Sequence, residues 1–194
     1  MKIIFATGNT GKLREAQGIL GPDYELVTPA QVGITEEIPE TGETLKDNSI
    51  QKAMYLYERT GMDCFADDTG LEVDALGGAP GVHSARYATD GHDFAANCDK
   101  LLRELAARPG EPRTARFRTV VTLILGGEKH FFDGVMEGKI AEQKSGNGGF
   151  GYDPVFISDD YPDRTVAELP DGTKNEISHR GKAMRAMAEW LKNR

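Results

Sequence analysis

The sequence predicts a single α/β domain, and three observations support this fold class. An apolar run at residues 2–6 leads through a glycine-rich turn into an amphipathic segment, which is the order strand, turn, helix. Further apolar runs alternate with segments of helical periodicity over the rest of the chain. Finally, the apolar residues 64–66 end at two adjacent carboxylates, Asp67 and Asp68, as expected at a sheet edge where ligands bind.

Length and composition are those of a soluble globular protein. The 194 residues can form one core, and 39% of them are apolar and 28% charged. No apolar stretch approaches the length of a membrane span, and the apolar start is too short for a signal peptide, so we expect a cytoplasmic protein without a membrane partner. Cys64 and Cys98 lack a CxxC spacing, which favours reduced, buried thiols. The net charge of −8 argues against a nucleic acid polymer as partner but leaves a small polyanion open.

The first turn has the geometry of an anion site. Thr7-Gly8-Asn9-Thr10-Gly11-Lys12 separates the strand from a helix that begins near Lys12, where free backbone N–H groups, the helix dipole and the Lys12 charge would converge. The spacing is not that of a Walker A loop, because only two residues separate Gly8 from Gly11 and Leu13 replaces the hydroxyl. An ordinary capped turn explains the same residues equally well.

A second strand is expected at residues 24–28, followed by an acidic loop and then a helix. Thr44 can cap this helix, Asp47 suits its first turn, and Gly61 ends it. Asn48 and Lys52 lie four residues apart and therefore share one helix face, which is either solvated or directed at a common site.

Asp67 and Asp68 follow the strand that contains residues 64–66. Because successive strand side chains point to opposite faces, the two acids need not share a role. One could face a metal or a water while the other supports a neighbouring loop. We expect the chain to turn at Thr69-Gly70 and to form another strand at 71–75; a merely structural turn remains the alternative.

The second half predicts one helix from Phe94 to Pro109-Gly110, strands at 116–125, 129–136 and 138–142, and a last helix after Ser178. The loop 146–151 matches GxGxxG by letter, but Tyr152-Asp153-Pro154 follows where a dinucleotide fold needs a helix. Such a loop could present Phe150 as a stacking face for a base, or fold its aromatic residues into the core.

Taken in order, these motifs resemble the inosine triphosphate pyrophosphatase family, the non-canonical purine nucleoside triphosphate (dITP/XTP) pyrophosphatases. The resemblance covers nearly the whole chain and shows no departure at the chemical positions; Thr69 stands where many members have Ser. The motifs that carry it are Thr7-Gly8-Asn9-Thr10-Gly11-Lys12, Glu40-Thr41-Gly42, Ala66-Asp67-Asp68-Thr69-Gly70-Leu71, Gly77-Gly78-Ala79-Pro80-Gly81 with Ser84-Ala85-Arg86-Tyr87, Gly148-Gly149-Phe150-Gly151-Tyr152-Asp153-Pro154 and Ile177-Ser178-His179-Arg180-Gly181.

The resemblance implies an elongated mixed central sheet flanked by helices, two lobes with the active-site cleft between them, and a homodimer. It implies Mg²⁺-dependent hydrolysis of ITP, dITP or XTP to the monophosphate and pyrophosphate, which keeps these nucleotides out of DNA and RNA. Glu40 and Asp68 would hold Mg²⁺, and Asp68 would also accept the proton of the attacking water, supported by Asp67. Substrate would be bound by Thr7, Gly8, Asn9, Thr10, Gly11, Lys12, Lys52, Thr69, Phe150, Gly151, Tyr152, Asp153, Lys174, His179 and Arg180.

Base selection has a physical basis on these expectations. Hypoxanthine and xanthine carry a carbonyl at C6 where adenine carries an amine, and a donor-only side chain such as Arg180 accepts the carbonyl and rejects the amine. Two other functions remain open. The Maf-like pyrophosphatases act on pyrimidine or modified nucleotides, and a regulatory module would bind a nucleotide without turnover. The base motifs argue against the first alternative, and the acids Glu40, Asp67 and Asp68 argue against the second.

Overall fold

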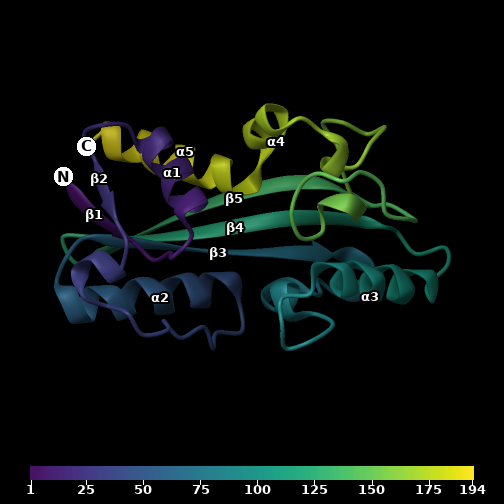
Figure 1. The fold of residues 1–194 in the computed structure, drawn as a ribbon, viewed down its shortest axis with the longest axis horizontal. Coiled ribbons are helices and arrows are strands. Elements are labelled where there is room, and N and C mark those ends of the chain that lie inside the picture. Colours follow the sequence, from purple (N-terminus) through teal and green to yellow (C-terminus); the bar gives the residue numbers. More distant parts are fainter. The chain divides into compact units, whose positions relative to one another are not determined.

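The computed structural model describes all residues, 1–194, and confirms an α/β fold with a six-stranded mixed sheet of order β2-β1-β3-β4-β5-β6 (Figure 1). Strand β1 runs parallel to both β2 and β3, whereas β5 and β6 are antiparallel. None of the helices has the length and apolar character that crossing a membrane requires. The strands are β1 (Lys2–Phe5), β2 (Glu25–Val27), β3 (Cys64–Val73), β4 (Thr114–Leu125), β5 (Glu128–Ile140) and β6 (Phe156–Ser158). The helices are α1 (Thr10–Leu20), α2 (Leu45–Thr60), α3 (Phe94–Ala106), α4 (Asp171–Ile177) and α5 (His179–Lys192).

The chain forms two compact units. The first unit comprises Met1–Asp68, Thr119–Gly134 and Arg180–Arg194, and the second comprises Thr69–Arg118 and Val135–His179. The boundaries therefore fall inside β3, β4 and β5, and one of them separates Asp68 from Thr69.

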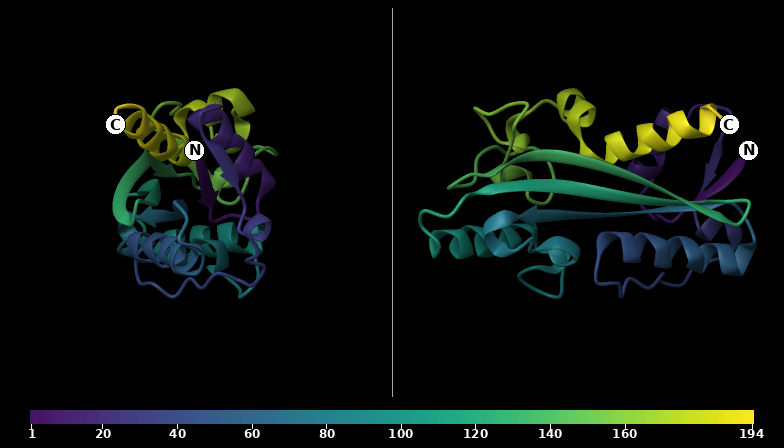
Figure 2. Two further views of the ribbon diagram at one scale, coloured as in Figure 1. Left: turned by 90° about the vertical axis from the view of Figure 1, so that its left-hand side faces the viewer. Right: turned by 180° about the vertical axis from the view of Figure 1, so that it is seen from behind.

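The first unit is a three-layer arrangement. Its strands are covered by α1 and α5 on one side and by α2 on the other (Figures 1 and 2). Phe5 and Phe65 stack at 4.3 Å between ring centroids within the α1–α5 layer, while Cys64 and Ala66 face the cluster on the α2 side. The alternation of strand side chains thus divides β3 between the two layers, which decides where the acids that follow will point.

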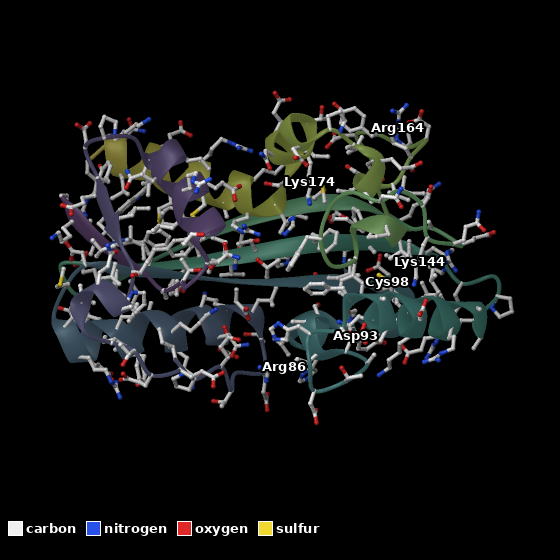
Figure 3. The ribbon with its side chains drawn as sticks, viewed as in Figure 1. Arg86, Asp93, Cys98, Lys144, Arg164 and Lys174 are labelled. Carbon is white, nitrogen blue, oxygen red and sulfur yellow. The ribbon has the colours of Figure 1, made fainter.

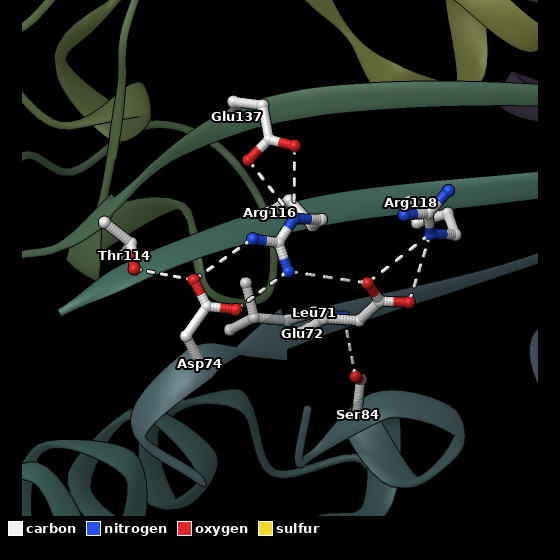
Figure 4. Close-up of polar contacts among 8 residues, drawn as sticks. All are labelled: Leu71, Glu72, Asp74, Ser84, Thr114, Arg116, Arg118 and Glu137. Atoms are coloured by element: carbon white, nitrogen blue, oxygen red, sulfur yellow. Dashed lines mark hydrogen bonds and ion pairs between the residues drawn. The ribbon is translucent and has the colours of Figure 1, made fainter. Parts of the chain in front are cut away.

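The second unit has one apolar cluster. Leu101 and Leu105 of α3 contribute to it, together with Phe117 of β4 and Phe156 of β6. On the opposite side of β4, Arg116 pairs with Asp74 and Glu137, and Arg118 pairs with Glu72 (Figure 4). The Arg116 guanidinium donates hydrogen bonds to Asp74 and Glu137. These bonds favour its charged form and raise the pKa of Arg116 above its usual range. Strand alternation therefore builds one apolar and one ionic face in this unit.

Two strand predictions are wrong. The chain does not turn at Thr69-Gly70; β3 continues unbroken to Val73, and the backbone N–H of Leu71 donates to the Ser84 hydroxyl at 2.9 Å. Strand β5 is likewise continuous where two strands were expected. Gly138 lies within this strand and has a packing role. A Cβ at this position would lie 2.1 Å from the Ile157 carbonyl oxygen, so the glycine allows β6 to approach β5 closely.

The other predicted elements are confirmed, with small shifts at their ends. Helix α1 begins at Thr10, two residues before Lys12, because Asn9 caps it. Helix α2 is capped by Thr44 and ends at Gly61, and α5 starts directly after Ser178. The short elements β6 and α4 were not predicted from the sequence, since three and seven residues carry too little periodicity.

Candidate active site

The glycine-rich turn is an ordered loop at the start of α1. The Asn9 carboxamide oxygen accepts hydrogen bonds from the N–H groups of Gly11 and Lys12, at 2.8 and 3.0 Å, and the Thr7 hydroxyl accepts from the Asn9 N–H. Gly8 is exposed and has open space around it. The loop therefore combines a capped helix N-terminus with exposed backbone, and Lys12 adds a cation beside it.

Asp67 lies at the centre of a cation cluster in the first unit. It is 2% exposed, and its Oδ2 lies 3.3 Å from the Lys12 Nζ and 3.7 Å from the Arg180 Nε. The Lys52 Nζ donates to the Asp67 carbonyl oxygen at 2.5 Å. Burial alone would raise the pKa of Asp67, but Lys12, Lys52 and Arg180 together hold that pKa below its usual range. Asp67 is therefore a buried carboxylate stabilised by three cationic side chains.

Asp68 points to the other face of β3, toward α2. Its Oδ2 accepts from the Asn48 Nδ2 at 3.0 Å, and its Oδ1 lies 3.8 Å from the Lys52 Nζ. The same Lys52 Nζ lies 2.6 Å from the Glu40 Oε1. The two carboxylate groups thus have different partners, Lys12 and Arg180 for Asp67 and Asn48 and Lys52 for Asp68, as the alternation of a strand predicts.

The position of the acids follows from the length of the neighbouring strand. Strand β1 pairs with β3 only as far as Phe65 and ends at Phe5, and its chain then leaves into the Thr7–Lys12 loop. Asp67 and Asp68 lie in β3 just beyond this point. They are in the middle of their own strand but at the carboxyl end of a parallel neighbour, where ligands bind in α/β sheets.

The environment of Asp68 suits a proton acceptor. Burial, together with the nearby carboxylates of Glu40 and Asp67, raises the pKa of Asp68 to about 6, although Lys52 and the Asn48 bond oppose the shift. A carboxylate with such a pKa is a stronger base than an ordinary aspartate and is still ionised at neutral pH. Lys52 responds in the opposite sense: burial disfavours its charge, but Asp67, Asp68 and Glu40 raise its pKa overall.

The donor set fits a magnesium ion that shares its coordination with substrate. Glu40 and Asp68 already converge on one cation, the Lys52 ammonium group. No group of three or more His, Cys, Asp and Glu side chains is close enough to hold a metal alone. Mg²⁺ is commonly held by one or two carboxylates, with water and phosphate oxygens as the remaining ligands.

The predicted base-binding loop lies in the second unit. Phe150 is 67% exposed, and its ring contacts Phe94, the first residue of α3, edge-on at 4.4 Å between centroids. The Asp153 Oδ2 accepts from the Phe150 N–H at 2.7 Å and also pairs with Lys174. Lys174 belongs to α4 and is labelled in Figure 3. The loop is wrapped tightly on Asp153, since a Cβ at Gly149 would lie 2.5 Å from that carboxylate oxygen. An exposed aromatic ring is therefore held by an anchored loop.

Three other residues predicted for base binding have structural partners here. Tyr152 is buried, and its hydroxyl donates to the Ser84 carbonyl oxygen at 2.6 Å, while burial raises its pKa. The Gly151 carbonyl oxygen accepts from the Cys98 Sγ at 3.5 Å, and its φ of 61° lies in the left-handed region. His179 stacks on Phe117 at 5.0 Å between centroids. Of the aromatic residues in the loop, Phe150 alone is exposed.

Arg180 belongs to the first unit and contacts one residue of α1 and one of β3. Its Nη1 donates to the Glu15 Oε2 of α1 at 3.2 Å, and its Nε faces Asp67. The sequence had grouped Arg180 with His179, but adjacent helical residues point in directions about 100° apart. Thr69, the first residue of the second unit, follows Asp68 in β3.

Comparison with known proteins identifies the family. The model of the Ham1 family matches residues 3–190. This chain belongs to the Ham1 family. A dITP/XTP pyrophosphatase of Porphyromonas gingivalis is 50% identical over 190 residues, covering 98% of this chain and 97% of its own length. The structure of a HAM1 protein from Coxiella burnetii superposes with a TM-score of 0.94 at 36% identity and full coverage of both chains. A dITP/XTP pyrophosphatase structure from Mycobacterium abscessus gives 0.84 at 42% identity, with 96% and 98% covered.

Sequence reasoning missed two of the residues that support the candidate site residues, Glu15 and Phe94, and it placed a third, Asn48, only on a shared helix face with Lys52. Glu15 pairs with Arg180, Asn48 binds Asp68, and Phe94 supports Phe150. The spacing of Asn48 and Lys52 indicated a common site as one alternative, but it did not indicate Asp68 as the partner. Glu15 and Phe94 depend on contacts between residues 165 and 56 positions apart, for which the sequence has no local pattern.

Replacing Asp67 by Asn should destabilise the protein. The change leaves Lys12 and Arg180 without their common counter-ion, and breaking a buried ion pair costs about 3–5 kcal/mol; partial exposure of Lys12 favours the lower value. Urea denaturation would measure the free energy of unfolding. Lys2→Ala, which removes only an exposed pair with Glu25, is the control. Equal stabilities of the two variants would contradict the central role of Asp67.

Proposed function

We propose that this protein hydrolyses non-canonical purine nucleoside triphosphates, such as ITP, dITP and XTP, to the monophosphate and pyrophosphate. The observation that carries the proposal is the carboxylate of Asp68, which shares the Lys52 ammonium group with Glu40 at the end of β1, where the Thr7–Lys12 loop begins. The family membership and the names of the similar proteins support the same reaction and substrate class.

The reaction is a hydrolysis at the α-phosphorus. Asp68 accepts a proton as a water oxygen bonds to this phosphorus, and the bond to the oxygen that bridges to the β-phosphorus breaks. The electron pair of that bond leaves with pyrophosphate. Because little covalent chemistry falls to the protein, catalysis depends on positioning and charge stabilisation, which the Thr7–Lys12 loop and the cations Lys12 and Lys52 supply.

Charge balance supports a divalent cation. The cluster holds three cationic side chains, Lys12, Lys52 and Arg180, and four carboxylates, Glu15, Glu40, Asp67 and Asp68. A triphosphate would be repelled by these acids unless a metal ion joins it. We propose that Glu40 and Asp68 hold Mg²⁺. The bound ion would polarise a phosphate oxygen and neutralise the charge that develops during the reaction.

The base is proposed to stack on Phe150, whose exposed ring is oriented by Phe94 and by the bond of its backbone to Asp153. Lys174 and His179 are proposed as neighbouring donors for the 6-carbonyl group. The same role for Arg180 requires that it exchange its bonds to Glu15 and Asp67 for the base.

A homodimer and a cytoplasmic location complete the proposal. The dimer rests on the family resemblance, and the location rests on the short apolar runs of the sequence and on its cysteine usage. Light scattering would test the dimer, and fractionation of source cells would test the location.

A panel of nucleotides with Mg²⁺ tests the function directly. We expect pyrophosphate from ITP, dITP and XTP and little from ATP, GTP, dTTP or UTP, with pyrophosphate and orthophosphate measured separately. EDTA should abolish the release and added Mg²⁺ should restore it. Orthophosphate as the product, or a preference for pyrimidines, would contradict the proposal; nucleotide binding without turnover would favour a regulatory module.

Asp68→Asn should remove the proton acceptor while preserving the shape of the side chain. We expect kcat to fall by roughly 10²–10⁴-fold, the usual contribution of general base catalysis. Binding of ITP, measured by calorimetry, should largely survive, because the amide oxygen of Asn can still face the cation. Asp159→Asn, an exposed change in the second unit, is the control. Turnover close to that of the unmodified protein would show that Asp68 is not the base.

Phe150→Ala should weaken substrate binding through the lost stacking, which is worth about 1–3 kcal/mol per base. KM for ITP should rise by roughly 5–150-fold, with a smaller change in kcat. Phe131, the other strongly exposed phenylalanine, lies on β5 of the first unit, and Phe131→Ala serves as the control. If both variants keep the original KM, Phe150 does not stack on the base.

A further inference from the structure

Two amide side chains of α2 hold the loop that carries Glu40. The Thr41 N–H donates to the Gln51 Oε1 at 2.8 Å, and the Gln51 Nε2 donates to the Thr41 hydroxyl at 2.9 Å. One helical turn earlier, the Asn48 Oδ1 accepts from the Gly42 N–H at 2.7 Å. The loop next to Glu40 is therefore fixed at two consecutive residues.

Asn48 differs from Gln51 because its other end reaches the acid of β3. The Asn48 Nδ2 donates to the Asp68 Oδ2 at 3.0 Å, and Asn48 is only 4% exposed. The orientation of this amide follows from its partners: Gly42 offers only a donor, so it faces the oxygen, and the Asp68 carboxylate requires the NH₂ group. One buried side chain thus joins the Glu40 loop to Asp68.

The approach of the loop to α2 is too close for any residue but glycine. A Cβ on Gly42 would lie 2.6 Å from the Asp47 Cβ and 2.9 Å from the Asn48 backbone nitrogen. Gly42 therefore seats the loop on the first turn of α2, directly over Asn48. Glu40 lies two residues before this contact, so its backbone is anchored to the helix that also carries Lys52.

The two oxygens of Asp68 have separate surroundings as a result. Asn48 occupies Oδ2, while Oδ1 faces Lys52, whose Nζ also contacts Glu40. Without the Asn48 bond, the carboxylate could rotate about its bond to the strand and pair with Lys52 through either oxygen. The bond leaves Oδ1 directed at the point where the two acids converge.

We propose that Asn48 is a positioning residue, which aligns Glu40 and Asp68 as a pair for a divalent cation by bonding the Glu40 loop and the Asp68 carboxylate simultaneously. The inference rests on the proposed function for the presence of that cation. Residues that orient metal ligands typically change metal affinity by 10–100-fold when they are replaced. We therefore expect replacement of Asn48 to lower the affinity for the metal ion, although Asn48 is not itself a metal ligand.

The test uses Mn²⁺ as the probe ion and an ITP analogue with a methylene group between the α- and β-phosphorus, so that binding is measured without turnover. Free Mn²⁺, followed by electron paramagnetic resonance, gives the Kd. Asn48→Ala should raise this Kd by about 10–100-fold. Gln51→Ala is the matched control, since it releases the same loop from the same helix but does not contact Asp68; we expect a Kd within about threefold of the unmodified protein.

Two further measurements make the outcome decisive. Asn48→Ser leaves a hydroxyl group and room for water beside the Gly42 N–H but cannot reach both partners; it should show the same loss and serves if Asn48→Ala does not fold. Thermal unfolding confirms that each variant is folded. An unchanged Kd in the folded Asn48 variants would overturn the inference, as would an equal loss in Gln51→Ala.

These results are separable from the proposed function. If the unmodified protein releases pyrophosphate but Mn²⁺ binding is indifferent to Asn48, the inference alone fails. If Mn²⁺ binding depends on Asn48 but no nucleotide of the panel is hydrolysed, the proposed function fails and the positioning role stands. If the unmodified protein binds no Mn²⁺ with the analogue, the inference is also overturned.

Discussion

The buried carboxylate of Asp67 is the interaction on which the proposed phosphate site depends. A charge almost without solvent contact requires compensation, and Lys12 from α1, Lys52 from α2 and Arg180 from α5 supply it. Three helices are thereby tied to one residue of β3. The arrangement also sets the cations in place before any nucleotide arrives, which lowers the cost of organising them on binding.

The division of roles between the two acids follows from the geometry of a strand. Asp67 faces the α1–α5 layer, where it serves as a counter-ion, and Asp68 faces α2, where burial and neighbouring acids raise its pKa. Adjacent residues of the same chemical type thus have opposite shifts in pKa. A counter-ion with a lowered pKa and an acid with a raised pKa can therefore lie side by side, because the alternation of the backbone places them in different environments.

The second unit holds an exposed apolar ring, that of Phe150, in a fixed position. Phe150 lies on a glycine-rich loop, and contacts of Asp153, Lys174 and Phe94 hold that loop in place. Tyr152 contributes through its burial in the core rather than through exposure.

The sequence by itself determined the fold class and most element boundaries, and it nominated candidate site residues, because these inferences depend on local periodicity, capping and motif order. The Asn9 and Thr44 caps and the Gly61 terminus are signals of that kind. Tertiary structure alone decided which of these residues meet. The continuity of β3 through Thr69-Gly70 depends on pairing and on Ser84 rather than on turn propensity, and it places the acids at the end of β1 instead of at their own strand's end. The partners of Asn48, Arg180 and Phe150 come from segments that are distant in the sequence. Local periodicity and capping signals contain no information about which distant segments pack together.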